Sequence, residues 1–568
     1  MRRRTLQVTL TAVLLLVCSW AWTNPNPKFA DSYSSEVPST WFEELYDVVK
    51  AEKTTPPPAS RIYGITAVAL YESIVAGTKK NRSLVGQLND LTSVPQPDKN
   101  QTYDWPAVSN AVLADTIRGL YPEISQASLD AINNLEQHFA SQRQQEVPEA
   151  VYSRSVAHGK AVSRAILDWA ANDRYSTFNN CMYVPAPVAG AWRPTPPDYN
   201  PNPLQPCWGM IRPMVLTSGD GCPPPGHPQF STRSDSEFYA GGLQVYNVNL
   251  HLTNEQKTIA DFWADNAGAT GTPPGHWIAI VSQLARNSPL SLAAAAEAYA
   301  RVGIAVHDAF IECWNRKYYY DLQRPVTYIN DTIDPNWRPY LVTPSFPTYT
   351  SGHSTQSGAS ARVLTNMLGI IRFTDTTNPD HGLTPPEQPR TFDSFDQAAA
   401  EAAISRLYAG IHFSFDNDDG LGSGHCIGQT IHDNVRFTHR APSSQDDNNN
   451  GIDDQFENPS MKQNQWSVTD TVGSGNENSY DLVADSSTLS LTATAEPFEL
   501  LDALNELLQV EIYSPSGILL AASPLTIGRA VVATVPAVAG TYTGKVKNLG
   551  QESVPYETLL ITASNALP

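Results

Sequence analysis

Residues 314–325 read Trp-Asn-Arg-Lys-Tyr-Tyr-Tyr-Asp-Leu-Gln-Arg-Pro and follow on from a long helical stretch that the sequence predicts over residues 289–319. Lys317 and Arg324 are seven residues apart, nearly two helical turns, so both cations can point to the same side. Pro325 then ends or bends the helix. The stretch therefore predicts a helix that presents two cations close to its end.

Two further segments carry groups suited to an anion. Residues 346–353 read Phe-Pro-Thr-Tyr-Thr-Ser-Gly-His, and a Gly after Ser before a new helix lets backbone N–H groups face an anion. Residues 405–416 read Ser-Arg-Leu-Tyr-Ala-Gly-Ile-His-Phe-Ser-Phe-Asp. Asp416 lies one helical turn after His412, so it is placed to fix the tautomer of that imidazole.

Each of these residues alone has an ordinary explanation, since helix charges are usually solvated and a single buried histidine is usually just hydrogen-bonded. Taken together, Lys317, Arg324, Arg406, His353 and His412 beside a helix N-terminus predict a pocket for a multiply charged tetrahedral oxyanion. In such a pocket one histidine attacks or ligates the central atom, and the other serves as acid–base.

The three segments resemble the motif of the superfamily that joins vanadium-dependent haloperoxidases with type 2 phosphatidic acid phosphatases and bacterial acid phosphatases. The pattern is Lys-six residues-Arg-Pro, then Ser-Gly-His, then Ser-Arg-five residues-His-three residues-Asp. The chain departs from it at Thr350, where the phosphatases usually carry proline. The long region before Lys317, the aromatic residues Trp314 and Phe346, and the Pro-Pro-Gly-His-Trp stretch at 273–277 favour the bacterial haloperoxidase branch.

The resemblance implies a bundle of helices that holds vanadate. The cofactor-binding residues that it implies are Lys317, Arg324, Ser351, Gly352, Arg406 and His412. His412 would bond the vanadium, His353 would act as acid–base, and Lys317 would polarise the bound oxidant. Trp314 and Phe346 would line the halide pocket.

The implied activity is oxidation of halide by hydrogen peroxide to hypohalous acid, which halogenates small organic acceptors. Bromide or iodide is favoured over chloride, whose oxidation is the hardest. Two alternatives stay open at this point. One is an exported acid phosphatase that works through a phosphohistidine at His412, and the other is a non-catalytic calcium-dependent adhesion protein with a relict pocket.

Composition excludes several classes of protein. The chain has 568 residues, with 37 Lys and Arg against 57 Asp and Glu, a net charge of −20, and 41% hydrophobic residues. This hydrophobic content argues against wholesale disorder, and the length suffices for about two to four domains. The negative charge argues against a sequence-independent nucleic-acid binder, because phosphate backbones attract the opposite sign.

Residues 1–23 have the pattern of a secretory signal peptide. Three arginines at positions 2–4 precede an apolar run over 8–17 and a small-residue exit. A permanent anchor, the alternative, needs about 20 apolar residues. We therefore expect a cleaved signal and a secreted or periplasmic protein, and no later segment is long and apolar enough to span a bilayer.

Five cysteines follow the signal region, an odd number and too few for a disulfide-stapled scaffold. Cys207 and Cys222 bracket a proline-rich loop and could pair after export. In the alternative interpretation all five cysteines are reduced and buried.

Helical periodicity dominates residues 24–440, which we predict to be a large α-helical catalytic domain. The predicted helices begin at Arg61 and continue at 107–120, 126–142, 148–171, 253–267, 276–286, 289–319, 354–368, 394–411 and 423–434. Residues 24–60 are polar and proline-rich, as expected of a lead-in. Dense prolines exclude helices between residues 172 and 230, where several aromatic residues favour an ordered covering loop.

An acidic linker is predicted over residues 441–462, and it contains a calcium-loop pattern at 446–457. The oxygen ligands of this pattern are Asp446, Asn448, Asn450, Asp454 and Glu457, with the Ile452 position also assigned to calcium. Gly451 supplies the tight turn at position 6. The alternative is an acidic, solvated linker without a bound ion.

Short alternating segments separated by turn residues follow over residues 463–568. Examples are 489–492, 509–513 and 556–561. They predict a small antiparallel β-sandwich, which resembles the pre-peptidase C-terminal domains appended to many secreted bacterial enzymes. The predicted fold class is therefore mainly α, with a large helical bundle followed by a small β-sandwich.

Overall fold

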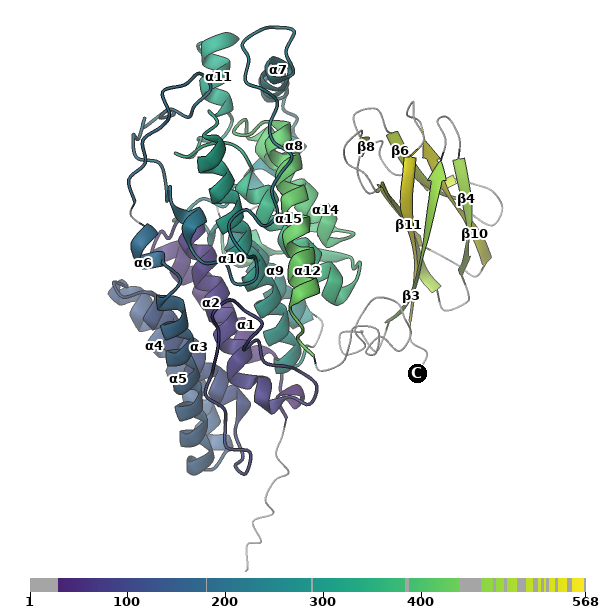
Figure 1. The fold of residues 1–568 in the computed structure, drawn as a ribbon. Helices are drawn as coiled ribbons and strands as arrows, with labels where there is room; N and C mark the ends of the chain where they lie inside the picture. Colours follow the sequence, from purple (N-terminus) through teal and green to yellow (C-terminus); the bar gives the residue numbers. More distant parts are fainter. Residues whose placement is uncertain are drawn as a thin grey trace, which may run out of the picture.

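The computed structural model describes residues 29–438, except 180, 288–289 and 384–387, together with the backbone of strands between residues 461 and 565 (Figure 1). Residues 29–438 are mainly helical. The α-helices are α1 Glu36–Ala51, α2 Pro56–Ile74, α3 Trp105–Leu120, α4 Gln126–Glu146, α5 Glu149–Ala171, α6 Tyr175–Phe178, α7 Glu237–Leu250, α8 Asn254–Phe262, α9 Thr272–Asn287, α10 Leu292–Tyr320, α11 Pro325–Thr332, α12 Gly352–Leu368, α13 Thr377–Asp380, α14 Phe395–Tyr408 and α15 Ser414–Asn434. The 3-10 helices are η1 Ala30–Ser32, η2 Val75–Gly77 and η3 Trp208–Met210. Strands β1 (Phe373–Asp375) and β2 (Arg390–Phe392) pair antiparallel.

Local sequence signals set where several helices begin and end. The side chains of Ser291, Ser351 and Ser394 each accept a hydrogen bond from a backbone N–H in the first turn of α10, α12 and α14, which is typical N-capping. Helix α10 ends where Asp321 takes a left-handed backbone conformation (φ 49°). Pro325 then occupies the first position of α11, where the missing N–H of proline costs nothing.

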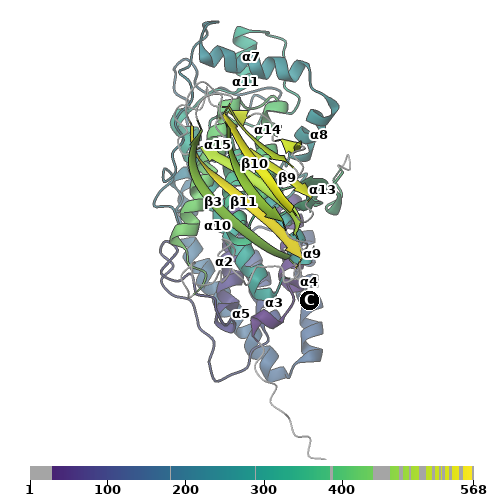
Figure 2. The same ribbon diagram turned by 90° about the vertical axis from the view of Figure 1, so that its right-hand side faces the viewer.

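The central helix α10 packs against α2 on one side and α12 on another, and α12 packs against α14 and α15. In both views α7 and α11 lie at one end of the helical region, and α4 and α5 lie at the opposite end (Figures 1 and 2). The largest buried side chains of the core include Trp41, Trp277, Trp314 and Tyr299.

Helices α12 and α15 approach each other closely at three glycines of α15, spaced four residues apart. A Cβ added to Gly420 would lie 3.0 Å from the Ser351 carbonyl oxygen, and one added to Gly424 would lie 2.2 Å from that of Thr355. A Cβ on Gly428 would lie 2.8 Å from the carbonyl oxygen of Ala359, which belongs to α12. Only glycine fits there, so backbone meets backbone along this contact.

The prediction that residues 24–60 form a lead-in is wrong. They contain α1 and the start of α2, and Trp41, Phe42 and Leu45 of α1 are buried in the core. The prolines that suggested a loop occupy only the first turn of α2, where proline is tolerated. Helix α7 was also not predicted. The prediction that no helix forms between residues 172 and 230 is wrong as well, because the short helices α6 and η3 lie between the prolines of this segment.

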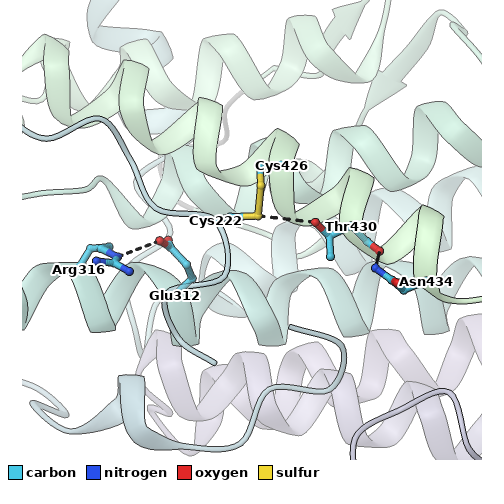
Figure 3. Close-up of a disulfide and its surroundings, with 6 residues drawn as sticks. All are labelled: Cys222, Glu312, Arg316, Cys426, Thr430 and Asn434. Atoms are coloured by element: carbon cyan, nitrogen blue, oxygen red, sulfur yellow. Dashed lines mark hydrogen bonds and ion pairs between the residues drawn. A yellow bond between two sulfur atoms is a disulfide. The ribbon is translucent and has the colours of Figure 1, made fainter. Parts of the chain in front are cut away.

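The long loop between α6 and α7 is tied down by two disulfides. Cys181 pairs with Cys207, Cys222 pairs with Cys426, and Cys313 is free and buried. Figure 3 shows the second disulfide joining this loop to α15, with Thr430 one turn further along the helix. The Cys207–Cys222 pairing considered from sequence is therefore wrong, because the fold brings distant Cys426 to Cys222.

The C-terminal strands form two antiparallel sheets. The strands are β3 Met461–Val472, β4 Glu477–Ala484, β5 Thr488–Pro497, β6 Leu507–Tyr513, β7 Leu519–Ala522, β8 Thr526–Ile527, β9 Val531–Pro536, β10 Gly540–Asn548 and β11 Val554–Asn565. One sheet has the order β4-β10-β6-β7 with β8 beside β6, and the other has the order β3-β11-β5-β9. A face-to-face sandwich of these sheets stays a prediction.

The signal peptide at 1–23 and the calcium-loop pattern at 446–457 lie outside the described residues. Within the described part of the chain, no helix combines the length and the hydropathy needed to cross a membrane.

Candidate functional site

The three predicted segments converge where α10, α12 and α14 meet. Lys317 comes from the last turn of α10, whereas Arg324 occupies the N-cap position of α11. The prediction that one helix presents both cations is therefore wrong, because α10 already ends at Tyr320. His353 lies in the first turn of α12, Arg406 lies in the last turn of α14, and His412 lies in the turn before α15. Tertiary packing thus gathers residues that are about one hundred positions apart in sequence.

The loop before α12 is held by the two cations of the first segment. Lys317 Nζ donates hydrogen bonds to the carbonyl oxygens of Pro347 and Thr348, at 3.1 and 2.9 Å, and to that of Thr350. Arg324 Nε donates to the Phe346 carbonyl oxygen at 2.7 Å. Lys317 therefore shapes the loop and contributes its charge to the site, while its three protons point at backbone carbonyls.

His412 is oriented by hydrogen bonds on both ring nitrogens. Its Nδ1 lies 2.8 Å from Asp416 Oδ2, and its Nε2 lies 3.0 Å from Arg324 Nη1. Because a carboxylate only accepts hydrogen bonds, Nδ1 carries the proton and Nε2 keeps its lone pair. The tautomer predicted from the His412–Asp416 spacing matches this geometry. Thr348 adds a hydroxyl that donates to Asp416 and lies 3.1 Å from Nδ1.

The charge state of both histidines follows from their surroundings. Burial and the nearby Arg324 and Lys317 cations hold the pKa of His412 well below its usual range. Burial and the Arg406 guanidinium do the same for the pKa of His353. Both imidazoles are therefore neutral near pH 7. The lone pair of His412 Nε2 accepts a hydrogen bond from Arg324 Nη1, whereas His353 Nε2 has no partner within the described residues.

The three cations are themselves buried at a cost. Burial lowers the pKa of Arg324 to about 9 and that of Arg406 to about 10. Burial also lowers the pKa of Lys317, with Arg324 adding to the effect. Such crowding of positive charge disfavours the empty site and favours an anion as its ligand.

Several buried donors in the site lack a hydrogen-bond partner within the described residues. They are Arg324 Nη2 and Arg406 Nε, and the buried ring nitrogen Nε2 of His353, which can accept a proton, also lacks a partner there. Arg406 Nη1 donates to the Trp263 carbonyl oxygen at 2.8 Å, which fixes the guanidinium and leaves Nε unpaired. A buried donor without a partner costs about 1–3 kcal/mol, so these nitrogens point to an acceptor that binds between them.

A cavity of about 150 Å³ opens onto this cluster. The polar side chains on its wall include Asp265, His353, Arg406 and His412. The apolar part of the wall includes Leu204, Phe310, Trp314, Pro344, Phe346 and Ile411. Lys317, Arg324 and Ser351 are not on the wall and act on the cavity from behind it.

The two aromatic residues predicted for a halide pocket lie together on the apolar wall. The ring centroids of Trp314 and Phe346 are 5.0 Å apart. Lys317 Nζ lies 5.6 and 5.1 Å from these two centroids, and Arg324 Cζ lies 4.6 Å from that of Phe346. The rings therefore present an apolar surface that carries positive charge behind it.

Gly352, for which a backbone cradle is predicted, lies on the wall of the same cavity, and a Cβ added there would make ordinary van der Waals contact with the Trp314 ring at 3.4 Å. The Ser351 side chain accepts a hydrogen bond from the Ser354 N–H at 3.4 Å and caps α12.

Sequence reasoning missed Thr348, although it lies inside the second segment, and it missed Asp265, for which the sequence carries no signal. The calcium residues Asp446, Asn448, Asn450, Ile452, Asp454 and Glu457 lie outside the described residues.

Comparison with known proteins supports the region and the fold. The family description "VCPO second helical-bundle domain" matches residues 297–440, which contain all the residues of the predicted oxyanion site. The chain is 29% identical over 236 residues to vanadium chloroperoxidase of Curvularia inaequalis, covering 31% of this chain and 38% of that protein. It is 34% identical over 137 residues to vanadium-dependent bromoperoxidase of Ascophyllum nodosum, covering 21% of this chain and 24% of that protein. The matched regions thus span less than two fifths of these relatives.

Solved structures extend the likeness over most of the helical region. A bacterial vanadium-dependent iodoperoxidase is 34% identical, with a TM-score of 0.66, covering 72% of this chain and 98% of that one. A holo-type bacterial vanadium-dependent chloroperoxidase shares the fold at 15% identity, with a TM-score of 0.52, covering 67% of this chain and 93% of that one.

Proposed function

The chain belongs to the vanadium haloperoxidase family, and we propose that it binds vanadate in the cavity and oxidises halide with hydrogen peroxide to hypohalous acid. The observation that carries this proposal is the set of buried, unpartnered nitrogens of Arg324, Arg406 and His353 beside His412 Nε2, whose lone pair accepts a hydrogen bond from Arg324 Nη1 and could bond a central atom in its place. A tetrahedral oxyanion offers acceptor oxygens to these donors and a central atom to the lone pair. The residues present therefore fit vanadate.

Each side chain has a distinct role in this proposal. His412 Nε2 would bond the vanadium, with Asp416 holding the tautomer. Lys317, Arg324 and Arg406 would neutralise the oxygens, assisted by the backbone N–H of Gly352 and by Ser351. Bound vanadate supplies a Lewis-acidic centre that makes hydrogen peroxide reactive toward halide.

His353 is the proposed acid–base. It is neutral and buried, and its Nε2 lies 3.9 Å from Asp265 Oδ2. It can therefore accept a proton from incoming hydrogen peroxide and hold it beside a carboxylate. The apolar wall formed by Phe310, Trp314 and Phe346 keeps bulk water away from this exchange.

We propose iodide or bromide as the halide. Large, weakly hydrated anions lose little on entering an apolar wall, and Lys317 and Arg324 behind Trp314 and Phe346 supply the compensating charge. The similar bacterial structure described as an iodoperoxidase supports this choice. Small organic acceptors would then react with the hypohalous acid.

A paired assay tests the proposed function. The purified chain is stripped of metals and assayed for iodide and bromide oxidation by hydrogen peroxide, and for p-nitrophenyl phosphate hydrolysis, before and after addition of orthovanadate. We expect halide oxidation that depends on vanadate. Phosphate-ester hydrolysis that vanadate inhibits, without halide oxidation, would instead establish the phosphatase alternative.

We also propose that the protein is exported, and the two disulfides support this, because disulfides persist in oxidising compartments. Mass spectrometry of the N-terminus of the protein secreted by its native host tests for cleavage after the predicted signal.

For residues 446–457 we propose a structural calcium ion that joins the helical domain to a C-terminal sandwich. The spacing of its oxygen ligands supports this proposal. Titration calorimetry with Ca²⁺ on the full chain, compared with an Asp446→Ala variant, tests it. Equal calcium binding by both proteins would contradict the assignment.

A further inference from the structure

His276 of α9 is buried between two carboxylates. Its Nδ1 lies 3.0 Å from both oxygens of Asp265, and its Nε2 lies 2.8 Å from Asp375 Oδ2. The imidazole also stacks on the Trp263 ring, with centroids 4.3 Å apart. All three side chains of the Asp265–His276–Asp375 trio are buried, so bulk water does not screen their interactions.

The geometry fixes the protonation of the trio. Carboxylates accept hydrogen bonds and do not donate them, so both ring nitrogens of His276 must carry protons. Burial disfavours this charge, but the attraction of Asp265 and Asp375 outweighs burial and raises the pKa of His276 to about 10. The trio therefore carries one positive and two negative charges, a net charge of −1.

One end of the trio belongs to the cavity described above. Asp265 lies on the cavity wall, and its Oδ2 is 3.9 Å from His353 Nε2. Its charge also stabilises the Arg406 guanidinium, which is hydrogen-bonded to the carbonyl of the neighbouring Trp263. The other end is anchored away from the cavity, where Asp375 accepts the Thr377 N–H at 2.9 Å.

We propose that His276 is a positioning residue that holds Asp265 toward His353 and Arg406 and cancels the charge of one buried carboxylate, so that an oxyanion can bind next to them. This inference rests on the proposed function, because it concerns the binding of vanadate. Without the imidazolium, two buried carboxylates would lie uncompensated beside each other, and Asp265, the one on the cavity wall, would be free to turn toward Arg406 and compete with the oxyanion.

The test measures vanadate affinity by equilibrium dialysis on the full-length protein without peroxide or halide. The variants are His276→Gln, Asp375→Asn and the double variant that carries both substitutions. The matched control is His158→Gln. His158 is also a buried histidine, but it packs edge-on against the Tyr103 and Trp105 rings and bonds the Ser73 carbonyl oxygen.

We expect His276→Gln to weaken vanadate binding by about 10- to 100-fold, the range typical of residues that orient metal ligands. The double variant returns the trio to a net charge of −1. Its vanadate affinity should therefore recover at least half of the drop in log Kd that His276→Gln causes. Asp375→Asn keeps the His276–Asp265 contact and should bind vanadate at least as tightly as the wild type. The control should bind like the wild type.

A purely structural role would make the double variant weaker than either single variant, and that result overturns the proposal. Wild-type affinity in a folded His276→Gln protein overturns it as well. If His276→Gln does not fold, a loss of affinity in Asp375→Asn is the refuting result. A wild-type protein that binds no vanadate would overturn the proposed function itself, which keeps the two failures apart.

Discussion

The two disulfides should differ in what their removal does, because they close loops of different length. Cys222 and Cys426 are 204 residues apart in sequence, whereas Cys181 and Cys207 are 26 apart. The chain-entropy relation gives about 5.4 kcal/mol of stabilisation for the long loop and about 3.5 kcal/mol for the short one. Replacing both cysteines of a pair by alanine should therefore cost about 2 kcal/mol more for the Cys222–Cys426 pair.

The short-loop disulfide should matter more for the site. It lies three residues beyond Leu204, a cavity residue whose carbonyl oxygen accepts hydrogen bonds from Trp314 Nε1 at 3.2 Å and from the Tyr318 hydroxyl at 2.6 Å. Loss of the Cys181–Cys207 link frees this segment, so the KM for halide should rise. Loss of the Cys222–Cys426 link, which ties a different part of the loop to α15, should leave that KM unchanged.

Urea unfolding of the oxidised protein and of the two double-alanine variants measures the stability difference, and steady-state halide oxidation measures KM. Equal losses of stability for the two pairs, or a larger loss for the short loop, would refute the chain-entropy argument. A raised KM in the Cys222–Cys426 variant alone would refute the assignment of the 181–207 segment to the cavity.

Three further predictions concern single side chains. Asp416→Asn removes the acceptor that holds the His412 tautomer, so vanadate affinity by equilibrium dialysis should fall by about 10- to 100-fold while circular dichroism stays unchanged. Phe346→Ala empties a buried position against Trp314, so urea unfolding should show a loss of about 3 kcal/mol, and a loss under about 1 kcal/mol would contradict the packing described. Burial raises the pKa of Glu312 from 4.5 to about 8, so between these pH values the folded chain keeps a proton that the unfolded chain has released. Stability therefore falls as pH rises through this window. In Glu312→Gln the melting temperature should fall less with rising pH than in the wild type. An unchanged dependence of melting temperature on pH would argue against a protonated Glu312.

The residues of the site could be predicted because their spacing reflects local structure. Lys317 lies in the last turn of α10 and Arg324 lies just before α11, which follows directly. His412 lies just before α15, and Asp416 in the first turn of that helix accepts its hydrogen bond. Such relations span few residues, so a sequence pattern records them. The long helix α10 was predicted for the same reason, since its serine cap and its alanine-rich start are local signals.

Residues that depend on tertiary contacts could not be predicted. Asp265 meets His353 and His276 only because the end of α8 lies beside α9 and α12, and nothing near Asp265 in sequence indicates this. Cys426 reaches Cys222 for the same kind of reason. The direction of the Lys317 protons was also beyond the sequence, because the path of the Pro347–Thr350 backbone decides it.

Helix α1 was missed for a different reason. Its apolar face, which includes Val37, Trp41 and Leu45, follows helical spacing, but polar neighbours and the prolines at 56–58 outweighed that signal. The helix is stabilised mainly by burying that face in the core, where Trp41 Nε1 also donates to Asn110 at 2.8 Å.

The glycines at 420, 424 and 428 have a consequence for engineering. His353 begins one of the two helices that they bring together, and His412 directly precedes the other. With main chain against main chain, the spacing of α12 and α15 is set by the backbone itself and leaves no side-chain size to adjust. Attempts to retune the halide chemistry should therefore work on the opposite wall, at Leu204, Pro344 and Phe346, where side-chain volume is the variable.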